Sequence, residues 1–293
     1  MIRLGTRGSA LALAQARLVA TALGDEVKVI PIATSGDRAR GVVADKSRFV
    51  KELEEALLGG EVDLAVHSAK DVPSELPSGL SIVGVPARAD PRDALCGAPS
   101  LGELPDGAVV GTSSLRRRAQ LLALRPDLHV RELRGNVDTR LRRLAEGDFA
   151  AIVVAKAGLD RLGRSDEGAR LAELVPAPGQ GCLALEARTE NARVAAAAGA
   201  LTARAALACL TAERALVGGL GATCRTPIGA FAELEDGALR LTAFAGTPDG
   251  SRWIRDIHRG DPDDPAVLGR AVAERLEAAG GREVLDEAER AAA

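Results

Sequence analysis

Aromatic side chains are scarce in this sequence of 293 residues, which contains four Phe, one Trp and no Tyr. Proteins commonly hold unpaired nucleic-acid bases by stacking them on aromatic rings, so this sequence offers few such surfaces. The formal net charge of −3 also argues against a general polyanion binder. We therefore expect no nucleic-acid partner and a core built mainly from Ala, Leu and Val.

Paired cysteines and long apolar runs are missing as well. The four cysteines, Cys96, Cys182, Cys209 and Cys224, are far apart and form no C-x-x-C pair, which fits neither a zinc site nor a disulfide scaffold. No run of about 18 apolar residues is present to span a membrane. The N-terminal segment lacks the continuous apolar stretch of a signal peptide. We expect a reduced, cytoplasmic protein without a bound metal or a membrane partner.

Short apolar runs alternate with helical patterns through the first two-thirds of the sequence. This alternation predicts right-handed crossovers and mostly parallel sheets with helices on both faces. The C-terminal third differs, since a long helical pattern is followed by three strands with turn signals between them and then by another helix. The expected strands of the first part are 2–6, 28–34, 64–68, 80–86, 108–112, 129–133 and 150–156. The C-terminal helices are expected at 201–219 and 265–279.

These patterns predict an α/β protein of three domains. Segments rich in Pro and Gly at 89–107 and 175–181 mark the crossings between the first two. A strand at 182–188 could return to the first sheet. The expected domains are a first α/β lobe of residues 1–88 plus 182–200, a second α/β lobe of residues 89–181, and an α+β domain of residues 201–293 with a three-stranded antiparallel sheet.

Arginines gather where predicted strands end and helices begin. Ligands of open α/β sheets bind at such junctions, where helix N-termini offer N–H donors. The guanidinium group suits carboxylate or phosphate recognition, although a run of arginines is also common on a plain solvated face. The sequence therefore predicts a cleft for a small ligand with several negative charges. The arginines concerned are Arg7, Arg116, Arg117, Arg134 and Arg140.

One predicted strand runs directly into Lys70 and Asp71, with Pro73 close behind. This pair could place a cation and a carboxylate in the cleft, but a surface turn with an incidental ion pair is the alternative. His67, inside the same strand, is expected to be a satisfied core histidine. Cys224 stands apart from the other cysteines, because it lies in the glycine-rich turn GLGATCRTPIGA (219–230) rather than in a predicted strand or helix.

Eight segments resemble the porphobilinogen deaminase (hydroxymethylbilane synthase) family, in the family's order and over nearly the whole chain. The resemblance implies two doubly wound lobes like those of periplasmic binding proteins and a smaller C-terminal α+β domain. The segments are TRGSALALAQA (6–16), FVKELEEALL (49–58), AVHSAKDVP (65–73), DPRDAL (90–95), VGTSSLRRRAQL (110–121), RELRGNVDTRL (131–141), PAPGQG (176–181) and CRTPIGA (224–230).

The resemblance implies a transferase of tetrapyrrole biosynthesis, and so of porphyrin and heme biosynthesis. The family joins four porphobilinogen molecules head to tail with loss of ammonia and releases 1-hydroxymethylbilane by hydrolysis. The chain grows on a dipyrromethane primer, a covalent cofactor whose thioether cysteine matches Cys224. Each pyrrole carries an acetate and a propionate, which agrees with an arginine-lined cleft. The expected partner is porphobilinogen, and we expect a monomer.

The resemblance also assigns site residues. Asp71 matches the family's catalytic aspartate, whose carboxylate can stabilise positive charge on a pyrrole and assist proton transfer. The residues expected to hold the cofactor are Cys224, Lys70, Ser68, Thr112, Ser113, Arg116, Arg117 and Arg134. The residues expected to bind the substrate are Arg7, Ser9, Arg140 and Gln180.

Two segments depart from the family's pattern. Residues 44–49 read ADKSRF, where many members carry a Gly-Gly-Lys-Gly-Leu-Phe loop, so Lys46 is present without the glycines of a mobile lid. Ala222 and Thr223 precede Cys224, where two glycines are common, and both restrict the backbone more than glycine does.

A binding protein without chemistry is the alternative interpretation of the same two lobes. The absence of an export signal, the Lys70–Asp71 pair and Cys224 weigh against it.

Overall fold

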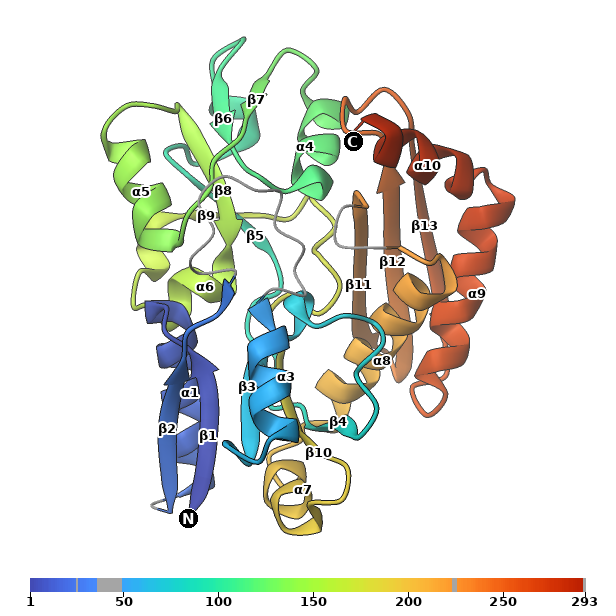
Figure 1. The fold of residues 1–293 in the computed structure, drawn as a ribbon. Helices are drawn as coiled ribbons and strands as arrows, with labels where there is room; N and C mark the ends of the chain where they lie inside the picture. Colours follow the sequence, from blue (N-terminus) through green and yellow to red (C-terminus); the bar gives the residue numbers. More distant parts are fainter. Residues whose placement is uncertain (25, 36–48, 223–225, 292–293) are drawn as a thin grey trace. The chain divides into compact units, whose positions relative to one another are not determined.

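The computed structural model describes the chain except for residues 25, 36–48, 223–225 and 292–293 (Figure 1). The described residues form two compact units. The first comprises Met1–Ala89 with Gly181–Leu207, and the second comprises Asp90–Gln180 with Ala208–Ala293. Cys224 and Lys46 both lie outside the described residues.

A five-stranded mixed sheet in the order β2-β1-β3-β10-β4 forms the centre of the first unit. β1 pairs in parallel with β2 and β3, whereas β10 is antiparallel to both β3 and β4. The segment expected to return to this sheet is therefore β10. The strands are β1 (Ile2–Arg7), β2 (Val27–Ile32), β3 (Leu64–Ser68), β4 (Leu80–Gly84) and β10 (Leu183–Arg188).

Helices cover both faces of this sheet. Leu4, Leu64 and Leu185 pack with residues of α1 (Ala10–Leu23) and α7 (Ala192–Gly199) in one buried cluster. Ala65 belongs to a second cluster, under α3 (Lys51–Leu58). The two clusters follow from strand geometry, because successive side chains of β3 point to opposite faces. In Figure 1, α1 and α3 accordingly lie on opposite sides of the blue strands.

The second unit contains a sheet of the same pattern, in the order β7-β6-β8-β5-β9. β6 pairs in parallel with β7 and β8, and β5 is antiparallel to β8 and β9. The strands are β5 (Asp93–Cys96), β6 (Val109–Gly111), β7 (His129–Arg131), β8 (Ala151–Ala155) and β9 (Ala169–Leu171). The helices are α4 (Leu115–Leu124), α5 (Val137–Ala145) and α6 (Lys156–Arg161).

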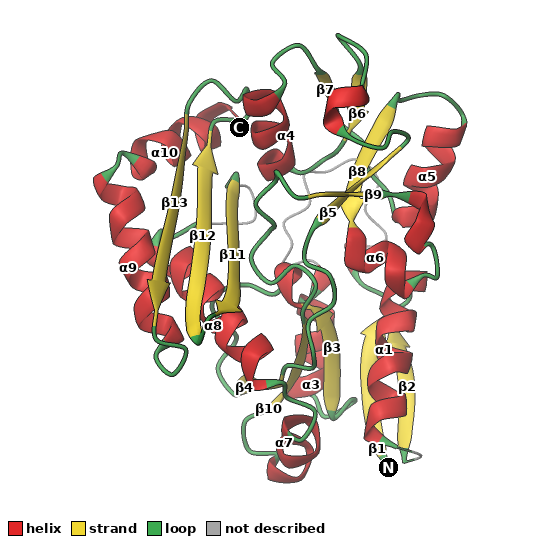
Figure 2. Cartoon of the chain, turned by 180° about the vertical axis from the view of Figure 1, so that it is seen from behind, coloured by secondary structure: helices red, strands yellow, loops and turns green. Residues whose placement is uncertain are grey.

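An antiparallel meander of three strands, β11 (Ile228–Glu235), β12 (Ala238–Gly246) and β13 (Trp253–Gly260), completes the second unit. Its first turn places Asp236 and Gly237 at positive φ, as hairpin turns require. Alternate residues of β11 and β12 form one buried cluster with α8 (Arg204–Gly219), α9 (Pro265–Ala278) and α10 (Gly281–Ala291). Figure 2 shows these helices beside the meander, with α4 near its opposite face.

The opposite face of the meander packs on the second α/β sheet's own elements. Phe231 and Phe244 point to this face, where they join Ala119 of α4 and Val175 in a buried cluster. The Arg118 guanidinium also donates a hydrogen bond to the carbonyl of Pro248. This packing makes the second α/β sheet and the meander one compact unit.

The predicted fold class, two α/β sheets followed by an α+β part with a three-stranded antiparallel sheet, is confirmed. Several segments differ from the prediction, and β5 and α10 are two of them. β5 lies inside 89–107, which we expect only as a crossing, because the charged Asp93 interrupts its short apolar run. α10 follows the stop at Gly280, whose positive φ ends α9 without ending the helical part of the chain.

No single helix of the described residues is long and apolar enough to cross a membrane. Only α7 and α8 taken together reach that length and hydropathy, and the pair is bent by 108°.

Candidate functional site

Several predicted site residues of the first unit lie at one edge of its sheet. Arg7 ends β1 and Ser68 ends β3, and these two strands pair in parallel. Ser9 caps α1, with its hydroxyl accepting a hydrogen bond from the Ala12 N–H at 3.3 Å. The Arg7 guanidinium lies 4.1 Å from the centre of the Phe49 ring. The structure therefore gathers Arg7, Ser9 and Ser68 at the carboxyl ends of neighbouring strands.

Lys70 and Asp71 lie directly after β3, in the 3₁₀ helix Ala69–Asp71. The Ala69 N–H donates to the Cys182 carbonyl at 3.1 Å, which ties this turn to the residue before β10. The Ser68 hydroxyl accepts a hydrogen bond from the buried Gln15 amide of α1 at 2.9 Å. The two residues before the Lys70–Asp71 pair are thus fixed, while the pair itself is only half-buried.

A buried acidic cluster lies one residue before this turn. His67 Nε2 lies 2.9 Å from Glu186 Oε2, and both side chains are nearly inaccessible. Glu54 of α3 is buried as well, and burial together with the charge of Glu186 raises its pKa, while His67 opposes that rise. His67 is a core residue, as expected, but it faces an acid. Sequence reasoning missed Glu54 and Glu186. The glutamate inside the apolar run CLALEAR (182–188) is nevertheless a signal for a buried acid that pairs with another residue.

The second group of predicted residues follows β6 in the second unit. Thr112 is buried, and its hydroxyl accepts a hydrogen bond from the Ser114 N–H at 3.2 Å. Ser113 is exposed beside it. The Ser114 hydroxyl caps α4 by accepting from the Arg117 N–H at 3.4 Å. Arg116 and Arg117 are therefore placed in the first turn of α4, as the sequence predicts.

Asp93 of β5 accepts hydrogen bonds from both of these arginines. Arg116 donates to its two oxygens from Nη1 at 2.8 Å and from Nη2 at 3.2 Å. Arg117 donates to Oδ1 from Nε at 3.0 Å and from Nη2 at 2.7 Å. Arg116 is 4% exposed and Arg117 is 5% exposed. Both guanidinium groups are held by hydrogen bonds before any ligand is considered.

The positive charges of Arg116 and Arg117 determine the protonation state of Asp93. Burial alone would raise the pKa of Asp93, but Arg116 and Arg117, with a further hydrogen bond from Gln180, hold that pKa far below its usual range. Asp93 is therefore ionised at neutral pH. Two guanidinium groups share one carboxylate, so this contact leaves one positive charge unbalanced. Among the residues that the structure describes, the buried Nε of Arg116 has no hydrogen-bond partner.

Gln180 belongs to the same cluster. Its amide donates to Asp93 Oδ1 at 2.9 Å and to the carbonyl of Pro91 at 2.7 Å, and the side chain is buried. Sequence reasoning predicted Gln180, Arg116 and Arg117 but missed Asp93, which connects them.

Arg134 and Arg140 lie at the junction between β7 and α5. Arg134 is exposed and pairs with Glu132 at 2.7 Å. Arg140 donates from Nε to the carbonyl of Gly135 at 2.8 Å. A positive φ at Gly135 forms the turn between these arginines. The contacts described for these two arginines include none with Asp93.

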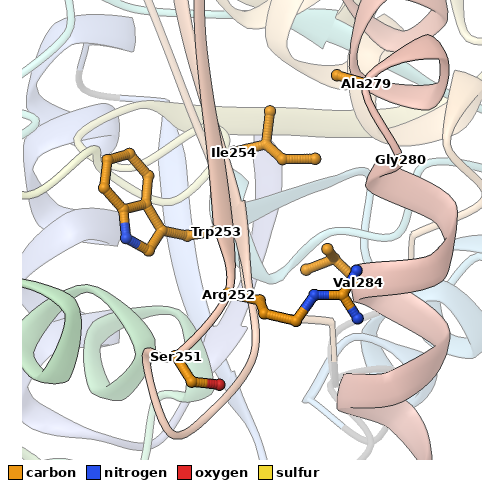
Figure 3. Close-up of a pocket in the computed structure, with 7 residues that line it drawn as sticks. All are labelled: Ser251, Arg252, Trp253, Ile254, Ala279, Gly280 and Val284. Atoms are coloured by element: carbon orange, nitrogen blue, oxygen red, sulfur yellow. The ribbon is translucent and has the colours of Figure 1, made fainter.

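A shallow hollow of about 340 Å³ lies elsewhere in the second unit, between β13 and the start of α10 (Figure 3). Arg252 at its rim pairs with Glu287 at 2.7 Å. Figure 3 shows Trp253 and Ile254 on opposite sides of their strand. None of the predicted site residues that the structure describes lines this hollow, whose lining is Ser251, Arg252, Trp253, Ile254, Ala279, Gly280 and Val284.

Two family models match the chain. The first, described as "Porphobilinogen deaminase, dipyromethane cofactor binding domain", covers residues 2–196. The second, described as "Porphobilinogen deaminase, C-terminal domain", covers residues 207–278.

Curated relatives extend over the full length. The porphobilinogen deaminase of Thermus thermophilus is 49% identical over 97% of this chain and 98% of its own. That of Roseiflexus castenholzii is 49% identical, with the same coverage of both chains. That of Deinococcus radiodurans is 45% identical over 97% of this chain and 98% of its own.

Among solved structures, the periplasmic VFT2 domain of Bordetella pertussis BvgS is similar over 68% of this chain and 85% of its own. The TM-score is 0.39 and the identity is 17%. The family models and the full-length relatives together establish that the chain belongs to the porphobilinogen deaminase family.

Proposed function

We propose that the two groups of residues described above carry out the reaction of the family. The chain is a transferase of porphyrin biosynthesis that joins four porphobilinogen molecules head to tail, with loss of ammonia, on a dipyrromethane cofactor. It releases 1-hydroxymethylbilane by hydrolysis. The family match decides against a binding protein without chemistry.

The Asp93 cluster fits the carboxylates of a dipyrromethane. Arg116 and Arg117 bring two positive charges to one carboxylate, so a ligand carboxylate would balance the remaining charge. The start of α4 adds backbone N–H donors, and a helix N-terminus favours negative charge. This unbalanced charge at a helix N-terminus is the observation that carries the proposal. We assign cofactor binding to Arg116, Arg117, Arg134, Thr112, Ser113, Ser68 and Lys70.

Cys224 is the proposed point of attachment. When bound, the dipyrromethane would supply the free pyrrole carbon to which the first porphobilinogen is joined, and each later unit would be joined to the free end of the growing chain. A thioether from Cys224 keeps that primer on the protein through every addition.

Asp71 is the proposed catalytic residue. Its carboxylate, held at the end of β3, can stabilise the positive charge on a pyrrole nitrogen and accept or return a proton there. Arg7 and Ser9 lie at the same sheet edge and can hold the carboxylates of the incoming porphobilinogen. Arg140 and Gln180 are the further residues that we assign to substrate binding.

The substitution Asp71→Asn tests this assignment. Asparagine keeps the size of the side chain but removes the negative charge, so we expect a folded protein whose ammonia release falls about 100-fold or more, a typical loss for a general acid–base group. Asp71→Glu keeps the charge and should retain more activity. Full activity of the Asp71→Asn protein would contradict the catalytic role of Asp71.

We also propose the organisation in which this enzyme works. Residues 1–88 with 182–200, residues 89–181 and residues 201–293 are proposed as three domains of a cytoplasmic monomer. Light scattering on the purified protein tests the monomer, because a dimer would give twice the mass.

A further inference from the structure

Residues 175–180 of the second unit are held by hydrogen bonds from several elements. The Val175 N–H donates to the Gln120 side chain at 2.7 Å, and the Gln120 amide donates back to the Val175 carbonyl at 2.9 Å. Arg116 Nη1 donates to the same carbonyl at 2.7 Å. The Ala230 N–H of β11 donates to the Pro176 carbonyl at 2.9 Å. This segment thereby connects α4 with the meander.

Glu213 of α8 holds the other end of the segment. Its Oε2 accepts a hydrogen bond from the Gly179 N–H at 2.6 Å, and its Oε1 accepts one from the Ala232 N–H at 2.8 Å. Glu213 is 0% exposed. Burial of a carboxylate costs several kcal/mol or more unless hydrogen bonds compensate, so a buried glutamate at this place needs these donors.

The backbone conformation of Gly179 sets the direction of the next side chain, that of Gln180. Gly179 has a φ of 73°, which a residue with a side chain rarely adopts, and the turn directs Gln180 to Asp93. Asp93 in turn holds Arg116 and Arg117. Hydrogen bonds, together with the peptide bond between Gly179 and Gln180, therefore connect Glu213 to both arginines.

We propose that Glu213 is a positioning residue for the reaction: by fixing Gly179 it sets Gln180 and Asp93, and so the orientation of the two arginines toward ligand carboxylates. This inference rests on the proposed function in one respect, the binding of carboxylates by Arg116 and Arg117. Glu213 itself touches neither arginine in the contacts described and lies on the buried side of α8.

The substitution Glu213→Gln tests the inference on the cofactor-loaded enzyme. Glutamine has the same shape but offers one acceptor oxygen and one NH₂ donor, so either Gly179 or Ala232 loses its acceptor. We expect faster amide hydrogen exchange in residues 176–180 or in β11. We also expect a KM for porphobilinogen about tenfold higher with a smaller change in kcat, the scale of one lost hydrogen bond in ligand binding.

A double-mutant cycle with Gln180→Leu separates positioning from general stability. If Glu213 acts through Gln180, the double variant should show a KM no higher than the worse single variant. Additive effects on KM would overturn the inference. The matched control is Leu216→Ala, which removes a fully buried side chain from the same helix without touching the segment. An equal rise in KM for Leu216→Ala would also overturn it.

The arginine assignment is tested apart from this by Arg117→Leu. A higher KM for Arg117→Leu with an unchanged KM for Glu213→Gln would overturn the inference and leave the proposed function standing. Unchanged KM values for both variants would contradict the arginine assignment, and the inference with it.

Discussion

Asp93 balances only one of the two positive charges that Arg116 and Arg117 bring into the second unit. At the scale of single residues, these buried charges are the basis of the proposed binding of ligand carboxylates. Their partners lie far away in sequence: 23 residues separate Arg116 from Asp93, and 87 separate Gln180 from it. Local patterns reveal the arginines at a helix start, but they contain no information about a partner at such a distance.

Replacement of Asp93 by Asn should therefore be among the most damaging single changes. Two buried guanidinium groups would lose their counter-charge, and breaking a buried pair in this way costs about 3–5 kcal/mol. We expect a lower unfolding temperature, partly restored when the polyanionic primer is attached. Thermal unfolding of the free and the primer-loaded variant measures both effects.

Asp90→Asn is the control for this change. Asp90 is only partly buried and pairs with Arg92 and Arg170, which are more exposed than Arg116, and its pKa is lowered to about 2. Pairs of that kind contribute about 0.2–1 kcal/mol. An equal loss of stability in the Asp90 and Asp93 variants would contradict a special role for the buried cluster.

Glu54 makes a residue-scale prediction about pH. Because its pKa is raised in the folded protein above the ordinary value of 4.5, the folded state keeps the proton longer than the unfolded state does. The free energy of unfolding must then fall as pH rises through and above 4.5. Glu54→Gln removes this loss, so the variant should be more stable than the parent near pH 8, by on the order of 1 kcal/mol.

Urea unfolding of both proteins at pH 4 and at pH 8 checks this prediction. Near pH 4 the parent carries a proton on Glu54 in both states, so the two proteins should differ little. Glu55→Gln, one residue along on the exposed side of α3, should reduce the pH dependence only slightly, because the charge of Glu55 is the smallest of the named causes that raise the pKa of Glu54. Parallel pH profiles of the parent and the Glu54→Gln protein would contradict a raised pKa of Glu54 in the folded state.

At the scale of elements, the structure places its site residues by repeating one arrangement. In each α/β sheet, three parallel strands lie side by side. The fourth strand is antiparallel to the third, and the fifth is antiparallel to the fourth. The ends of β1 and β3 carry Arg7 and the Asp71 turn, and the end of β6 carries the start of α4. The proposed site residues thereby lie at strand ends, whose positions are fixed by the sheet rather than by a loop.

Sequence patterns predict some of these strands and miss others, for a physical reason. β8 is a continuous apolar run and β3 begins with one, and both strands are buried almost throughout, so they are visible in a sequence. β5 is only four residues long and begins with a charge, since its aspartate is stabilised by distant arginines rather than by exposure. Glu213 escapes prediction in the same way, because its partners are backbone groups of two other elements.

At the scale of the whole molecule, the order of the family's motifs along the chain identifies the enzyme, which local patterns do not. Residues 2–196 and 207–278 match the two family models, so the lobes and the meander belong to one enzyme. Composition, periodicity and the placement of the arginines alone lead only to an α/β protein with a cleft for a small ligand that carries several negative charges. The covalent cofactor and Cys224 follow from the resemblance, and Cys224 lies outside the residues that the structure describes.

The intact mass of the denatured protein tests the covalent cofactor most directly. Protein made with ample porphobilinogen should carry the added mass of two linked pyrrole units, and Cys224→Ala should carry none. Cys96, Cys182 and Cys209 are buried and should be unmodified in a peptide digest. An unmodified mass for the parent protein, or an added mass that persists in Cys224→Ala, would contradict the attachment of the primer at Cys224.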